Sequence, residues 1–128
     1  MKTILVVEDF SGIRKLVCQK LRSKGYSILT ATTGREAYEL LNKTVSEVNL
    51  VISDFDMPDV QEFDLLRMIK GNPKLESLPI IYLDCKLLSD GKKPGNSGFD
   101  VEAFRDDYFF REVGRAMQTA GSIVNIVN

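Results

Sequence analysis

The sequence predicts an α/β fold built on a parallel β-sheet. Two short runs, Ile4–Val7 and Leu50–Asp54, are apolar almost throughout, and carboxylates stand at their carboxyl ends. Continuous apolar strands are typical of parallel sheets, because helices cover both faces and bury every side chain. Helix-like segments alternate with these and two further strand-like runs, which indicates right-handed crossovers between parallel strands.

The first half of the chain alternates regularly between strand and helix patterns. After the first strand, Ser11 can cap a helix that runs to about Lys24. A short strand is predicted at Tyr26–Thr30. Thr33 and Glu36 then have the spacing of a capping box, which predicts the start of a second helix.

The middle of the chain repeats the same alternation. The strand Leu50–Asp54 is followed by a predicted third helix over Phe63–Lys70, which ends before a Gly-Asn-Pro sequence. A fourth strand, Ile80–Leu83, follows a proline and leads to Asp84. A short helix is predicted at Val101–Arg105.

The C-terminal part permits two assignments. Apolar residues from Val113 onward form a stripe about 120° wide on a helical wheel, the width of a core-facing helix. We therefore predict a fifth strand at Tyr108–Phe110 and a helix over about Val113–Val127. The alternative assignment makes Ser122–Val127 a terminal strand.

Composition excludes several classes of protein. The formal net charge of the 128 residues is −1 without a long basic run, which argues against nucleic-acid and polybasic membrane contacts. No apolar run approaches the roughly 20 residues of a membrane span, and no signal peptide is visible. Two cysteines, Cys18 and Cys85, are too few for a disulfide scaffold and fit the cytoplasm. The absence of histidine excludes histidine-based triads and metal sites.

The carboxylates at the strand ends are the candidate functional residues. Glu8, Asp9 and Asp54 would end neighbouring strands, where they repel by about 4 kcal/mol per pair at 4 Å and an effective dielectric of 20. A bound Mg²⁺ removes this cost and can orient a phosphoryl group. An aspartate beside such a metal is a reasonable nucleophile. The alternative is that these acids only cap helices or face solvent.

Two motifs in this order resemble the receiver domain of response regulators, in particular stand-alone chemotaxis-type receivers. They are the acidic pair followed by Phe-Ser (Glu8–Ser11) and the Asp-x-x-Met-Pro turn (Asp54–Pro58). The resemblance extends from Lys2 to about Leu83 and more loosely beyond, so we expect residues 1–128 to be a single receiver domain. It implies a flavodoxin-like, doubly wound, five-stranded parallel sheet of order 2-1-3-4-5 with helices on both faces.

The resemblance also implies a function in two-component signalling. Asp54 would accept a phosphoryl group from a histidine kinase or phosphotransfer protein. Glu8, Asp9 and Asp54 would hold Mg²⁺, with the main-chain carbonyl of Asp56 as a further ligand. The face formed by the fourth helix, fifth strand and fifth helix would then bind an unidentified target protein. Such a domain signals and is not an enzyme.

The chain departs from the family at the positions that sense the phosphoryl group. Asp84 stands where the family has a threonine or serine hydroxyl, and a carboxylate repels a phosphate instead of donating to it. If the fifth strand is Tyr108–Phe110, Arg111 stands where the family has a lysine. Its planar guanidinium group has the same charge as the lysine ammonium group but a different shape. Tyr108 would then occupy the aromatic switch position.

Two other functions stay open at this point. Asp84 and Arg111 could pair and fix one conformation, which would make the chain a pseudo-receiver that only binds proteins. The run Asp54–Asp56 is also similar to the Asp-x-Asp motif of aspartyl-phosphate hydrolases. In those enzymes the motif follows the first strand and a cap domain is present, for which this chain has no room.

Overall fold

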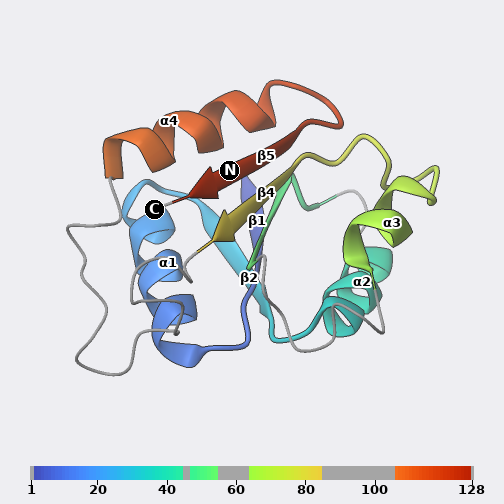
Figure 1. Ribbon diagram of the computed structural model, residues 1–128, viewed down its shortest axis with the longest axis horizontal. Helices are drawn as coiled ribbons and strands as arrows, with labels where there is room; N and C mark the ends of the chain where they lie inside the picture. The colour runs from blue at the N-terminus through green and yellow to red at the C-terminus, as the bar shows by residue number, and fades with distance from the viewer. Residues whose placement is uncertain (1, 45–46, 55–63, 85–105, 128) are drawn as a thin grey trace.

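The computed structural model describes residues 2–44, 47–54, 64–84 and 106–127 (Figure 1). These segments form one parallel sheet with the strand order β2-β1-β3-β4-β5, which confirms the predicted flavodoxin-like arrangement. The elements in chain order are β1 (Thr3–Val7), α1 (Ser11–Ser23), β2 (Ser27–Ala31), α2 (Gly34–Lys43), β3 (Leu50–Asp54), α3 (Leu65–Lys70), β4 (Ile80–Asp84), α4 (Asp106–Met117) and β5 (Ile123–Val127).

The sheet is the middle of three layers. Figure 1 shows α1 and α4 on one side of the strands and α2 and α3 on the other. Side chains alternate along each strand, so Ile4 and Val6 of β1 pack toward α1 and α4, whereas Leu5 and Val7 pack toward α2 and α3. Every residue of β3 is buried, as its continuous apolar sequence predicts.

Local capping places the helices much as the sequence indicates. The hydroxyl of Thr33 accepts a hydrogen bond from the Glu36 backbone N–H at 3.1 Å, which caps α2. The Glu36 carboxylate in turn accepts from the Thr32 N–H at 3.2 Å. The predicted cap of α1 is wrong by one residue: Phe10 is the N-cap and Ser11 is the first helical residue.

The C-terminal assignment that we preferred is wrong, and the alternative is confirmed. The predicted strand Tyr108–Phe110 lies within helix α4, and the predicted helix Val113–Val127 ends at Met117. The last five described residues form β5, within the Ser122–Val127 segment of the alternative, and β5 pairs in parallel with β4. The predicted target-binding face relied on a strand at Tyr108–Phe110 and a helix at Val113–Val127, and the structure has neither element with those bounds.

A turn at Gly121 explains why the helix cannot continue. Gly121 has φ = +70°, a left-handed conformation that other residues rarely adopt. Its N–H donates to the Ser77 carbonyl at 2.7 Å, and its carbonyl accepts from Lys70 Nζ at 2.9 Å. The Ile80 N–H donates to the Ser122 carbonyl at 2.9 Å and starts the β4–β5 ladder. These bonds fix β5 as an edge strand.

The connection from β4 to β5 differs in hand from the other three. The β1–α1–β2 and β4–α4–β5 units run in opposite directions across the sheet, yet α1 and α4 pack on the same face. Two crossovers that move in opposite directions across a sheet, with their helices on the same face, have opposite handedness. The α2 and α3 units run toward β5 on the other face and therefore share the hand of the first unit. The prediction of right-handed crossovers thus cannot hold for all four connections.

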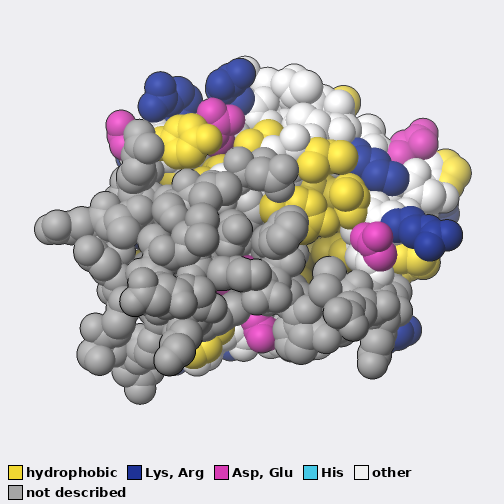
Figure 2. All heavy atoms as spheres, viewed as in Figure 1, with side chains coloured by type: hydrophobic (Ala, Val, Ile, Leu, Met, Phe, Trp, Pro, Cys, Tyr) yellow, Lys and Arg dark blue, Asp and Glu magenta, His cyan; other side chains and the backbone are white. Residues whose placement is uncertain are grey.

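The exposed surface carries charges of both signs. Figure 2 shows lysine and arginine side chains near aspartate and glutamate side chains along the upper and right edges of one face. Among large hydrophobic residues, Met68 and Ile123 are the exposed ones in the described part of the chain. No helix described by the structure combines the length and apolarity that crossing a membrane requires.

Candidate functional site

The register of two central strands brings the candidate acids together. Val7 at the end of β1 lies beside Ser53 in β3. Both strands run in the same direction, so the residues that follow, Glu8 and Asp54, reach the same edge of the sheet. Asp9 comes next in the chain. Carboxylate oxygens of Glu8, Asp9 and Asp54 all lie within 4.8 Å of one another.

Two of these three acids are buried. The exposed fractions of Glu8 and Asp54 are 3% and 4%, whereas Asp9 is exposed to solvent. Buried carboxylates so close together repel more strongly than surface ones, because protein screens charge less than water does. The site is therefore open on the Asp9 side and closed on the sheet side.

Hydrogen bonds hold the backbone of this acidic cluster in place. The Glu8 N–H donates to the Ala31 carbonyl of β2 at 3.0 Å, and the Glu8 carboxylate accepts from the Phe10 N–H at 2.9 Å. Arg14 Nη1 donates to the main-chain carbonyl of Glu8 at 2.9 Å and more weakly to that of Asp9 at 3.5 Å. The Glu8 carboxylate thus helps to cap the start of α1 as well as lining the cluster.

The donor set fits a hard divalent cation. Carboxylate oxygens are the ligands that Mg²⁺ prefers, and Mg²⁺ usually keeps several waters beside one or two carboxylates. Asp9 is exposed, so solvent reaches that side of the cluster. The expectation that the three acids meet at one edge is confirmed.

The other predicted site residues fall into two groups, those that the structure leaves untested and those that it places elsewhere. Asp56, whose main-chain carbonyl was the further metal ligand, lies outside the described residues. Asp84 ends β4, and the neighbouring Leu83 lies beside Asp54. The strand that was to carry Arg111 to the site does not exist: Arg111 is an exposed residue of α4. Tyr108 lies on the same helix, so its assignment as a strand-borne switch residue is also wrong.

Sequence reasoning missed two residues that support the site. Arg14 anchors the main chain of the acidic pair, and the buried Ser53 donates its hydroxyl to the Asp54 carbonyl at 3.2 Å. Arg14 stands on the first turn of α1, next to an acidic pair, and that proximity was the available signal. Ser53 is a polar residue inside an apolar strand, which is a weaker signal because it is shared by many core strands.

Comparison with known proteins identifies similar sequences and structures. The sequence profile of the response regulator receiver domain matches residues 4–87. Chemotaxis protein CheY-3 of Vibrio cholerae is 30% identical over 106 residues, covering 79% of this chain and 80% of that protein. Two-component response regulator ORR3 of rice, Oryza sativa, is 28% identical over 110 residues, covering 86% and 79%. The crystal structure of V. cholerae CheY4 aligns with a TM-score of 0.69 at 26% identity, covering 91% and 98%.

Proposed function

This chain belongs to the response regulator receiver domain family of two-component signalling, and on that premise we propose that Asp54 accepts a phosphoryl group. The observation that carries the proposal is the cluster of Glu8, Asp9 and Asp54 oxygens within 4.8 Å. A histidine kinase or a histidine phosphotransfer protein supplies the group, and a partner protein reads the result.

The chemistry is a transfer between two nucleophiles. A carboxylate oxygen of Asp54 forms a bond to phosphorus while the bond from phosphorus to the donor nitrogen breaks, and the donor histidine keeps that electron pair. Bound Mg²⁺ would neutralise charge on the phosphoryl oxygens. Glu8 and Asp9 would hold that ion, and the main-chain carbonyl of Asp56 would complete its protein ligands. The buried position of Asp54 orients the nucleophile and limits access of bulk water.

Treatment with acetyl phosphate and Mg²⁺, followed by intact mass spectrometry, tests this proposal. We expect the native chain to gain one phosphoryl group and Asp54→Asn to gain none. Asp107→Asn is the matched control, because Asp107 is an exposed carboxylate of α4 outside the cluster. Chelation of Mg²⁺ should abolish the gain. Equal labelling of the native chain and Asp54→Asn would show that another residue is the acceptor.

A second candidate function follows from Asp84. Its position at the end of β4, one residue beyond the partner of Asp54, is where the family has its phosphoryl-sensing hydroxyl. A receiver without that hydroxyl could keep the acidic cluster but fail to change conformation. Arg111 lies on α4 and not after the predicted strand, and its pairing with Asp84 stays a prediction.

Beryllofluoride, a phosphoryl analogue, distinguishes the two candidates. With Mg²⁺ present, a switching receiver should show amide shifts that extend from Asp54 into β4 and β5. Shifts confined to the residues around Glu8, Asp9 and Asp54 would favour the fixed pseudo-receiver. A generic phosphate ester offered in the same buffer should not turn over, and steady release of phosphate would support the hydrolase alternative instead.

A further inference from the structure

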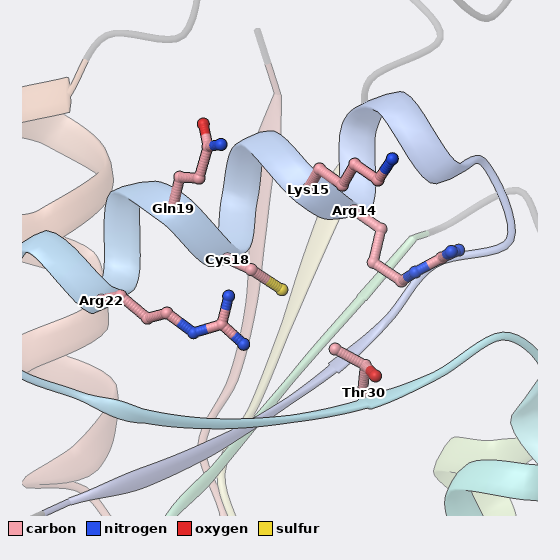
Figure 3. A pocket seen from close by; sticks show the side chains of 6 residues that line it. All are labelled: Arg14, Lys15, Cys18, Gln19, Arg22 and Thr30. Carbon is pink, nitrogen blue, oxygen red and sulfur yellow. The ribbon is translucent and has the colours of Figure 1, made fainter.

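A basic hollow lies beside the acidic cluster, between α1 and the edge strand β2. Its volume is about 200 Å³, and no acidic residue lines it. The lining residues are Arg14, Lys15, Cys18, Gln19, Arg22 and Thr30. Figure 3 shows Arg14, Cys18 and Arg22 projecting from the side of α1 that faces β2. Within the described structure, none of the three cations forms an ion pair.

Two of the three cations, Arg14 and Arg22, lie in a row with Cys18 between them. Arg14, Cys18 and Arg22 are four residues apart in sequence, so they lie on one side of the helix. The two arginines are eight positions apart on the helix, a rise of about 12 Å. Four residues of an extended strand span about 13 Å. Two acidic side chains at positions i and i+4 of an extended peptide would therefore match the two arginines.

The floor of the hollow is a strand with an open edge. β2 pairs only with β1 in the described sheet. The Ser27 N–H donates to the Lys2 carbonyl, and the Ala31 carbonyl accepts from the Glu8 N–H. Alternate residues of a parallel strand direct their backbone groups to opposite sides, so Ile28 and Thr30 direct theirs toward the open edge. An added strand can pair with these groups.

We propose that this face binds an extended acidic peptide segment of a partner protein, which adds to the sheet beside β2 and places two carboxylates under Arg14 and Arg22. The side chain between the two acids faces Cys18 and must be small. Backbone pairing supplies the orientation and the arginine row supplies the selectivity for acidic segments. This surface shares only Arg14 with the acidic cluster and does not include Asp54, so the proposal does not depend on phosphorylation of Asp54.

Titration of ¹⁵N-labelled protein with a synthetic peptide tests the proposal. The probe is Thr-Thr-Glu-Thr-Ala-Thr-Glu-Thr-Thr, with both termini blocked. The controls are the same peptide with Gln for both Glu residues and a peptide with the two Glu residues adjacent, hence on opposite sides of a strand. We expect saturable shifts of the Ile28 and Thr30 amides with the probe, and at least about fivefold weaker binding of either control peptide.

Three variants separate strand addition from simple charge attraction. Arg22→Glu should weaken binding at least about fivefold, whereas Lys43→Glu, an equal charge change on an exposed residue of α2, should leave it unchanged. Thr30→Pro removes an outward N–H that an edge strand can lose without unfolding, and it should abolish the shifts. Circular dichroism checks that each variant folds. The proposal would be overturned if the probe peptide does not bind or if the Glu and Gln peptides bind equally well. It would also be overturned if inorganic phosphate of equal charge displaces the peptide, or if Thr30→Pro leaves binding unaffected.

Discussion

The acidic cluster and the basic hollow are neighbours of opposite charge. Each brings like charges close together, and they differ in how deeply those charges are buried. In the acidic cluster, two of three carboxylates are 3–4% exposed, so little water separates them. In the basic hollow, Lys15 and Arg22 are exposed and water screens their repulsion. Burial strengthens the repulsion between the carboxylates of the acidic cluster, whereas water weakens the repulsion between the exposed cations of the hollow.

Arg14 belongs to both regions. Its guanidinium binds the main-chain carbonyls of Glu8 and Asp9, and its side chain also lines the hollow. These two hydrogen bonds go to carbonyl oxygens and not to the carboxylates. The two charged regions are thus joined through the backbone at the start of α1. The contribution of this anchoring by Arg14 can be tested by mutation.

The largest expected effect is the stabilisation of the acidic cluster by Mg²⁺. At a concentration one hundred times its dissociation constant, a ligand that binds only the folded state adds about 2.7 kcal/mol to the free energy of unfolding. Urea unfolding with and without Mg²⁺ should show a gain of this order for the native chain. Asp54→Asn should lose most of the gain, and Arg22→Gln should keep it. An equal gain in Asp54→Asn would place the cation elsewhere.

Replacing the two arginines of the row should have unequal effects. Arg14→Ala removes the hydrogen bond to the Glu8 carbonyl, so we expect it to lower the free energy of unfolding by about 1–2 kcal/mol. Arg22→Ala removes an exposed side chain and should change stability by less than about 0.5 kcal/mol. Chemical denaturation of both variants measures the difference. Equal values would mean that the Arg14 hydrogen bond contributes little in solution.

The smallest effect concerns Cys18, between the two arginines. Burial raises the pKa of its thiol above the ordinary value of 9.0, and the opposing effects of Arg22 and Arg14 are smaller. A raised pKa keeps the proton on the folded protein, so the stability from this group is complete below pH 9 and is lost as pH rises through the folded pKa. The slope is at most about 1.4 kcal/mol per pH unit.

Unfolding by urea between pH 8 and about pH 10 measures this loss, and Cys18→Ala should flatten it. Tyr82 also has a raised pKa, mainly from burial and secondly from Asp64, and its contribution has the same sign above pH 10. The comparison must therefore be made between native chain and variant at each pH. An identical pH profile for both would mean that the arginines offset the effect of burial on Cys18.

The sequence predicted correctly those elements for which hydrophobic periodicity and capping residues indicate the same structure. The apolar run Leu50–Asp54 became β3 with the same bounds, and the Thr33–Glu36 capping box opened α2 where expected. The acidic cluster followed from the same reasoning, because parallel strands deliver their carboxyl ends to one edge. The resemblance added the strand order. These predictions depended on periodicity and capping, which nearby residues fix.

The C-terminal part shows where local signals are insufficient. From Val113 onward the apolar residues fit a helical stripe, and Ile123–Val127 fits a strand equally well. The free edge of β4 and the bonds that hold Gly121 decide between these assignments, and both come from distant parts of the chain. The wrong assignment placed Arg111 and Tyr108 at the site, whereas both lie on α4.

By itself the sequence determined the alternation of elements, the burial of the central strands and the meeting of Glu8, Asp9 and Asp54. Periodicity and strand direction are properties of short segments, so they can be read residue by residue. Only the tertiary structure decided which segment pairs with β4, on which face α4 packs, and that cations of α1 stand over an open edge of β2. Those outcomes depend on competition between segments for the same sheet edge and the same apolar surface.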